Sequence, residues 1–279
     1  VWSPTVIPLL PCRRPRIATR RAVVQTLAAS LLLPAMGAAQ AQIAVFTAIN
    51  RIARYRALSQ RIAKVYVQMQ LGVLPDQAAA ALAAAQKLVR SGFEDLQKVP
   101  WPAELAGQIA AVRGAVDTLQ ALLVVPPSMP SVLAVAAQAD RVLAIANTAT
   151  EAFEKSSKAA TAKLVNVAGR QRALSQRLAK NYFLLATGGE FKGARAELAS
   201  DAQEFRSAMA FLAGAPLSTP AIREELALGE GQWLFFGAAL QRKADARGLA
   251  DVATTSERLL EVTDRLTNLY DAALKEVLG

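Results

Sequence analysis

The chain has 279 residues, of which 53% are hydrophobic and 19% charged, and its formal net charge is +10. Alanine and leucine dominate, a composition typical of helices, and the length allows one large domain or two smaller ones. There is no histidine, which excludes Ser-His and Cys-His nucleophiles, haem attachment, and zinc or di-iron sites that need histidine. We therefore expect neither an enzyme nor a cofactor.

The first 41 residues have the pattern of a secretory signal peptide. Arg20 and Arg21 precede an apolar run that ends at Met36, and Ala39-Gln40-Ala41 supplies the small residues of a cleavage site. The run is about 15 residues long, too short for a comfortable membrane span. We expect cleavage after Ala41 and export to the periplasm, by the Sec route or, given a partial twin-arginine match, the Tat route.

Removal of this segment would change two bulk properties of the chain. Five of the 32 basic residues lie in it and none of the 22 acidic residues, so 27 basic residues remain and the net charge becomes +5. The only cysteine, Cys12, would also be lost, so no disulfide framework is expected. No later segment is continuously apolar over about 18 residues, and we expect no membrane span in the mature chain.

Glycine and proline divide the mature chain into two sets of four expected helices. They cover residues 43–71, 76–98, 103–124 and a helix from 131 in the first set, and 166–187, 191–213, 219–243 and 248–278 in the second. Short connections favour antiparallel neighbours. We therefore predict an all-α fold of two tandem antiparallel four-helix bundles, with repeat 1 over residues 42–160 and repeat 2 over residues 161–279.

The connection between the two sets is open to two interpretations, because residues 131–168 contain neither glycine nor proline. One continuous helix would stack the bundles end to end. A break near residues 156–161 would instead form a hinge and bring the first helices of both sets side by side. We favour the break.

The first helix of each set carries the same short sequence, which we call the box. It reads NRIARYRALSQRIAKVY at residues 50–66 and NVAGRQRALSQRLAKNY at residues 166–182, and eleven of the seventeen positions are identical at a constant offset of 116. Identity of this extent indicates a tandem repeat. Both copies are rich in arginine and lysine and neither contains a carboxylate, which is unusual for a core helix.

Helical periodicity places the arginines of each box on two faces. One face is a stripe of small and apolar residues that also contains Ala53, Arg56 and Gln60 in the first copy and Gly169, Arg172 and Gln176 in the second. Another helix can approach such a stripe closely. An arginine there must be hydrogen-bonded or neutralised, because an unpaired buried charge is costly.

The neighbouring sequence offers Arg56 and Arg172 no acidic partner. Residues 43–75 hold five basic residues and residues 155–189 hold seven, and neither segment contains a carboxylate. A small anion between the two stripes would satisfy both arginines, because guanidinium groups present paired donors that match planar oxyanions.

The other residues of the two stripes have supporting roles in this interpretation. Ala53 and Gly169 would let backbone or ligand come near. Gln60 and Gln176 either orient the arginines or bridge helices. We expect Asn50, and its counterpart in the second box, to bond to the local backbone.

The ordinary alternative for any of these arginines is solvation, or pairing with a carboxylate from a distant part of the chain. That alternative is our expectation for the second face of the boxes, which carries Arg54, Arg61, Arg170 and Arg177. For Arg56 and Arg172 both interpretations stay open.

The pattern N-x-A-G-R-Q-R-x-L-S-Q-R-x-A-K-x-Y resembles the box of the PilJ-type sensor domain, also called the type IV pili methyl-accepting chemotaxis transducer N-terminal domain. This domain is related to the extracytoplasmic domain of NarX-like nitrate/nitrite sensor kinases. The resemblance covers seventeen residues in each half, and the four-helix layout extends it over most of the mature chain. It implies a helical bundle in the periplasm.

The resemblance also implies a ligand. In the nitrate sensors the anion binds between the first helices of two subunits, through an arginine of the box and the backbone near its glycine. That arginine corresponds to Arg56 and Arg172 and the glycine to Gly169, with Ala53 in its place in the first copy. No transmembrane, HAMP, kinase or methyl-accepting segment follows in this sequence, so we expect a membrane-bound sensor or transducer to receive the signal.

Three functional classes follow from the sequence. The first is an exported, non-enzymatic sensory module that binds a small oxyanion, nitrate or nitrite, between the box helices and relays its presence to a membrane partner. The second is a periplasmic interaction or scaffold protein with no small ligand. The third is nucleic-acid binding, suggested by the basic balance, but predicted export and the lack of a reading motif argue against it.

Overall fold

The structure is a computed structural model that describes residues 20–278 apart from 160, 190 and 192, with side chains described from residue 42 to 277 outside those gaps. Contacts divide the chain into two compact units, Val1–Ala41 and Gln42–Gly279. Residues 1–19 of the predicted signal peptide lie outside the described part. The predicted cleavage after Ala41 coincides with the boundary between the units but stays a prediction.

The described residues form eight helices and no strand, so the fold class is all-α, as predicted. The helices are α1 (Arg20–Gln70), α2 (Pro75–Gln97), α3 (Ala103–Leu122), α4 (Met129–Ser157), α5 (Ala162–Ala186), α6 (Ala194–Ala213), α7 (Pro220–Leu240) and α8 (Ala246–Leu278). The first box lies on the C-terminal part of α1 and the second on α5. This order is consistent with two four-helix bundles.

Local sequence explains where several helices begin and end. Gly72 adopts a positive φ of 66° after α1, a conformation that costs glycine little. Pro75 is the first residue of α2, where its missing N–H is harmless. Ser128 caps α4 in a capping box with Ser131, and Thr219 caps α7 by accepting a hydrogen bond from the next turn.

The predicted break between the two sets of helices is confirmed. Helix α4 ends at Ser157 and α5 begins at Ala162, and Lys158 has a positive φ of 54° that a continuous helix does not allow. The first helices of the two sets therefore lie side by side. At their crossing a Cβ built on Gly169 would lie 3.2 Å from the Cβ of Ala53.

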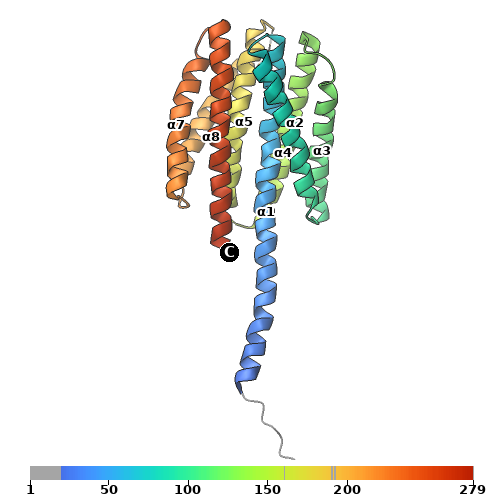
Figure 1. Ribbon diagram of the computed structural model, residues 1–279, viewed down its shortest axis with the longest axis vertical. Helices are drawn as coiled ribbons and strands as arrows, with labels where there is room; N and C mark the ends of the chain where they lie inside the picture. The colour runs from blue at the N-terminus through green and yellow to red at the C-terminus, as the bar shows by residue number, and fades with distance from the viewer. Residues whose placement is uncertain (1–19, 160, 190, 192, 279) are drawn as a thin grey trace, which may run out of the picture. The chain divides into compact units, whose positions relative to one another are not determined.

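Within the unit Gln42–Gly279, helices α1, α4, α5 and α8 are central, with α2 and α3 on one side and α6 and α7 on the other (Figure 1). Helix α5 packs against α4, α6 and α8, and most of its side chains are buried. A helix buried on nearly all sides is usually apolar all round. Because α5 carries the second box, several arginines, lysines and amides enter this interior and need partners there.

By length and composition alone, α4 is the one described helix that could cross a membrane, with an 18-residue window of mean hydropathy 1.3. This differs from the expectation that no later segment is apolar enough. About 39% of that window is buried inside the protein. Val132, Val135 and Val142 of α4 belong to the hydrophobic core, and core helices of bundles often have such a composition.

Candidate anion-binding site

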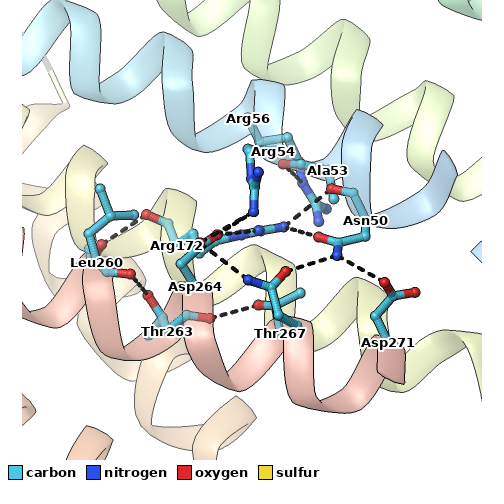
Figure 2. A network of polar contacts seen from close by, with 12 residues as sticks. Asn50, Ala53, Arg54, Arg56, Arg172, Leu260, Thr263, Asp264, Thr267 and Asp271 are labelled. Atoms are coloured by element: carbon cyan, nitrogen blue, oxygen red, sulfur yellow. Dashed lines mark hydrogen bonds and ion pairs between the residues drawn. The ribbon is translucent and has the colours of Figure 1, made fainter. Parts of the chain in front are cut away.

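The two boxes exchange hydrogen bonds across the crossing of α1 and α5. Arg56 donates from Nη1 to Asn166 Oδ1 at 2.9 Å and from Nη2 to the Asn166 carbonyl at 3.1 Å. Arg172 donates from Nη2 to Asn50 Oδ1 at 3.0 Å and to the Asn50 carbonyl at 3.3 Å (Figure 2). Each arginine therefore binds the asparagine that begins the opposite box, and the pairing is reciprocal.

Both arginines are 1% exposed, so the crossing buries two guanidinium groups. A Cβ on Gly169 would lie 3.1 Å from Arg172 Nη2 and 3.4 Å from Arg56 Nη2. The space between the two stripes is thus filled by the protein's own side chains. The expectation that Asn50 and Asn166 bond to the local backbone is wrong. Both accept hydrogen bonds from the other half of the chain, where the first half is α1–α4 from residue 42 on and the second half is α5–α8.

A third partner distinguishes the two arginines. Arg172 donates to the carboxylate of Asp264 on α8 at 2.7 Å (Figure 2), whereas Arg56 donates to the amide oxygen of Asn147 on α4 at 3.0 Å. The absence of acids near the box in sequence therefore does not hold in space for Arg172. Of the two arginines, Arg56 is the one whose direct partners are all neutral, including the Ala53 carbonyl at 3.4 Å.

The charges around the two arginines differ accordingly. Burial, with repulsion from Arg170 and Arg172, lowers the pKa of Arg56 to about 9, although Glu151 and Glu154, which bond to its partners Asn147 and Asn166, oppose the change. Burial also lowers the pKa of Arg172, but attraction to Asp264 limits the change and leaves it at about 10. Burial alone would raise the pKa of Asp264, yet its arginine partners outweigh burial and hold that pKa below the usual value. Both arginines remain cations at neutral pH.

A cavity of about 320 Å³ lies beside Arg56. Three arginines line it (Arg56 of α1 with Arg170 and Arg177 of α5), together with the acids Asp140 and Glu197 and several apolar residues. Two of these arginines are ion-paired with acids outside the lining, Arg170 with Glu204 and Arg177 with Asp201, so Arg56 is the lining arginine without a carboxylate in direct contact. The volume exceeds the roughly 30 Å³ that one water molecule occupies in the liquid. The cavity can hold a small anion.

A second cavity of about 180 Å³ lies in the matching position of the other half. Its lining repeats the first at box positions, with Arg54, Arg61 and Arg172, but adds three acids, Glu257, Glu261 and Asp264. Its lining charges cancel. The two cavities have equivalent places in the repeat but differ in the number of acids that line them.

The second face of each box is ion-paired rather than solvated. Arg54 contacts Asp264 at 2.9 Å, and Arg61 donates from Nε to Glu257 at 3.1 Å. The equivalent arginines of the second box pair with acids of α6, Arg170 with Glu204 and Arg177 with Asp201. These arginines follow the ordinary alternative of pairing with distant carboxylates.

The glutamines of the boxes bridge helices within their own half. Gln60 donates to the Ala139 carbonyl at 3.1 Å and to Asp140 Oδ1 at 3.1 Å, both on α4. Gln176 donates to the Ser256 carbonyl on α8 at 2.9 Å. Neither bonds to Arg56 or Arg172, so of the two roles left open for these residues the bridging one is present.

The box lysines are buried residues that the sequence did not single out. Lys64 is 0% exposed and Lys180 is 1% exposed. Each pairs with an acid of the opposite half, Lys64 with Glu257 on α8 and Lys180 with Asp140 on α4. Both boxes have lysine at this position, but acids 193 and 40 residues away could not be assigned to them from the sequence.

Residues 153–234 match a family model, PilJ, described as type IV pili methyl-accepting chemotaxis transducer N-term. The match begins in α4, includes the whole second box and ends in α7, so this part of the chain is similar to that sensory domain family. It covers less than half of the chain and does not extend to a second copy over the first box. Comparisons with curated proteins and with solved structures gave no match.

Proposed function

We propose that this protein is an exported, non-enzymatic sensory module that binds a small oxyanion beside Arg56 and relays its presence to a membrane-bound partner. Nitrate and nitrite are the ligands we favour. The family match of residues 153–234 supports a sensory role. The cavity at Arg56 supports an anion as the ligand.

The observation that carries the proposal is that no carboxylate contacts the buried guanidinium of Arg56. It bonds only to amide and carbonyl oxygens, whereas Arg170 and Arg177 of the same cavity are paired with Glu204 and Asp201. A buried charge without a counter-ion is costly. An anion in the cavity would supply that counter-ion, and planar oxyanions match the paired donors of arginine.

The position of the cavity also supports a relay. Its lining comes from α1 and α4 of the first half and from α5 and α6 of the second. An anion there would contact both halves at once. The bound anion would therefore stabilise the arrangement of the two halves in which Arg56 and Arg170 lie closest to the anion. A partner that contacts both halves could detect this change in their arrangement. The periplasm is the proposed location, because the predicted signal peptide would direct export there.

A thermal-shift panel of nitrate, nitrite, sulfate and chloride tests the proposal. We expect nitrate or nitrite to raise the melting temperature of the purified protein more than chloride does. Arg170→Gln removes a charged donor from the cavity and should weaken binding roughly ten- to hundredfold. Arg54→Gln is the matched control, because Arg54 has the same position in the other box and lines the other cavity; it should leave binding unchanged. A melting temperature that none of the four anions changes would rule out the proposal.

A scaffold or interaction protein without a small ligand is the second candidate. All three nitrogens of Arg56 already have oxygen partners inside the chain, so this arginine can also act as a structural link. Helix α7 exposes the large apolar residues Leu228, Leu234 and Phe235, which suit a protein contact. The same anion panel separates the candidates, and nucleic acid is not proposed as a partner of either.

A further inference from the structure

Helices α4 and α8 each supply one side chain on which two arginines converge. Asn147 Oδ1 of α4 accepts from Arg56 at 3.0 Å and from Arg170 at 3.4 Å. Asp264 Oδ1 of α8 accepts from Arg172 at 2.7 Å and from Arg54 at 2.9 Å (Figure 2). The arginines are equivalent in the repeat, so Asn147 and Asp264 occupy equivalent places. One place holds an amide and the other a carboxylate.

One helical turn further on, the chemistry is reversed. Asn147 is followed by Glu151, which accepts a hydrogen bond from the Asn147 amide at 2.6 Å. Asp264 is followed by Asn268, whose amide donates to Asp264 at 3.4 Å. At these two positions each helix thus carries one acid and one amide, in opposite order. Glu151 is exposed, so the acid of α4 lies a turn away from the position that touches the arginines.

A third difference adds to the contrast between the cavities. Ala144 lines the cavity at Arg56 where Glu261 lines the other. The cavity beside Asp264 is also smaller, about 180 Å³ against about 320 Å³. The carboxylate of Asp264 provides the two arginines with charge-assisted hydrogen bonds of the kind that a bound oxyanion would give.

We infer that Asp264 is a built-in anion: its carboxylate takes, in the second half, the place that a soluble oxyanion takes in the first. The residue at this one position of the repeat then decides which half binds. Asn147 leaves Arg56 with no carboxylate in direct contact, and Asp264 gives Arg172 and Arg54 a permanent one. This inference rests on the proposed function and predicts one working site per chain and one latent site.

Loss of the working site is tested with Asn147→Asp/Glu151→Asn, which gives α4 the order of α8 and leaves the net charge unchanged. We expect nitrate affinity, measured by titration calorimetry, to fall more than about tenfold because a carboxylate now competes for the arginines. A readout without ligand accompanies it. In buffer free of oxyanions the variant should melt at or above the temperature of the unaltered protein, since Arg56 gains a direct counter-ion.

Gain of the latent site is tested with Glu261→Ala/Asp264→Asn/Asn268→Glu, which gives α8 the residues of α4 at all three positions. We expect the stoichiometry of nitrate binding to rise from one to two per chain. Unchanged binding in the α4 variant, or a stoichiometry that stays at one in a folded α8 variant, would overturn the inference while leaving the proposed function intact. If the unaltered protein binds no nitrate but the α8 variant does, the built-in anion stands and the proposed function falls. If neither binds nitrate, both fall.

Discussion

Two groups of side chains in the box behave differently, although they share one short sequence. Gln60 and Gln176 bond to helices of their own half. The box tyrosines do the same: Tyr66 donates to the Val125 carbonyl at 2.5 Å and Tyr182 to the Arg242 carbonyl at 3.1 Å. The arginines of the stripes and the lysines instead reach residues of the opposite half.

The difference shows how seventeen residues can specify two levels of structure. The glutamine amides and tyrosine hydroxyls connect each first helix to other parts of its own half. The stripe arginines and the lysines, which cost most when buried alone, connect the two halves. The two lysines therefore have their counter-ions only when the halves are packed together. The expected consequences of breaking either group of contacts follow, from the largest to the smallest.

The largest effect is expected for Arg172→Ala. This change leaves the Asp264 carboxylate and the Asn50 oxygens without their buried partner and should lower the free energy of unfolding by about 3–5 kcal/mol. Urea denaturation measures it. In a double-mutant cycle with Asn50→Ala the two changes should couple by about 0.5–3 kcal/mol. Additive effects would show that the contact across the halves contributes little.

Acid should break the lysine contact. Burial alone would raise the pKa of Glu257, but the charges and hydrogen bonds of Lys64 and Arg61 outweigh it and hold the pKa at about 2, against an ordinary 4.5. Because the folded pKa is the lower one, this stability is fully present above about pH 4.5 and is lost as the pH falls toward 2. The difference between the two pKa values corresponds to about 3 kcal/mol of unfolding free energy.

Measurements of the unfolding free energy between pH 6 and pH 2 check this expectation, because this range includes both pKa values of Glu257. Glu257→Gln should flatten the pH dependence in that window, at the cost of lower stability at neutral pH because Lys64 then lacks its carboxylate. A variant whose pH dependence equals that of the unaltered protein would place the acid sensitivity on other carboxylates.

The tight crossing of α1 and α5 should respond to one methyl group. Gly169→Ala should destabilise by about 1–3 kcal/mol, because its Cβ would meet Ala53 and both stripe arginines at 3.1–3.4 Å. Gly114→Ala is the matched control on α3, where a Cβ meets nothing within 4 Å, and should stabilise by about 0.4–1 kcal/mol. Thermal unfolding of both variants measures the two changes in stability. Changes of the same sign would contradict the prediction.

The smallest effect is expected where contacts stay within one half. Tyr66→Phe removes a hydrogen bond to the Val125 carbonyl, in the connection after α3, and should cost about 1 kcal/mol. Tyr182→Phe removes its equivalent, to the Arg242 carbonyl after α7. Because these tyrosines lie in different halves, the double variant should show the sum of the two losses, in contrast to the coupling expected for Arg172 and Asn50.

The fold was largely predictable because its signals are local. Glycine and proline mark most helix ends. The break between α4 and α5 was favoured without such a signal, because residues 131–168 contain neither. Helical periodicity was also sufficient to place Arg56 and Arg172 on a buried stripe. These inferences need only neighbours within a few turns of the same helix.

The partners of those arginines were not predictable, because they are contacts between distant residues. Asp264 lies 92 residues from Arg172, and Asn166 lies 110 residues from Arg56. Periodicity gives the face of a helix but not which helix covers it. Asn50 and Asn166 were noted as identical in the repeat, yet local hydrogen bonding explains an asparagine equally well. Only the packing of the halves distinguishes the two roles.

The reciprocal contacts between the boxes join two halves of a single polypeptide. The same set of contacts between separate subunits would weaken as the protein is diluted, since association then competes with translational freedom. Here the four-residue connection from Lys158 to Thr161 keeps the partners at a high effective concentration. The fraction of molecules in which the two boxes are in contact should therefore be the same at trace amounts of protein as at the concentrations used for calorimetry.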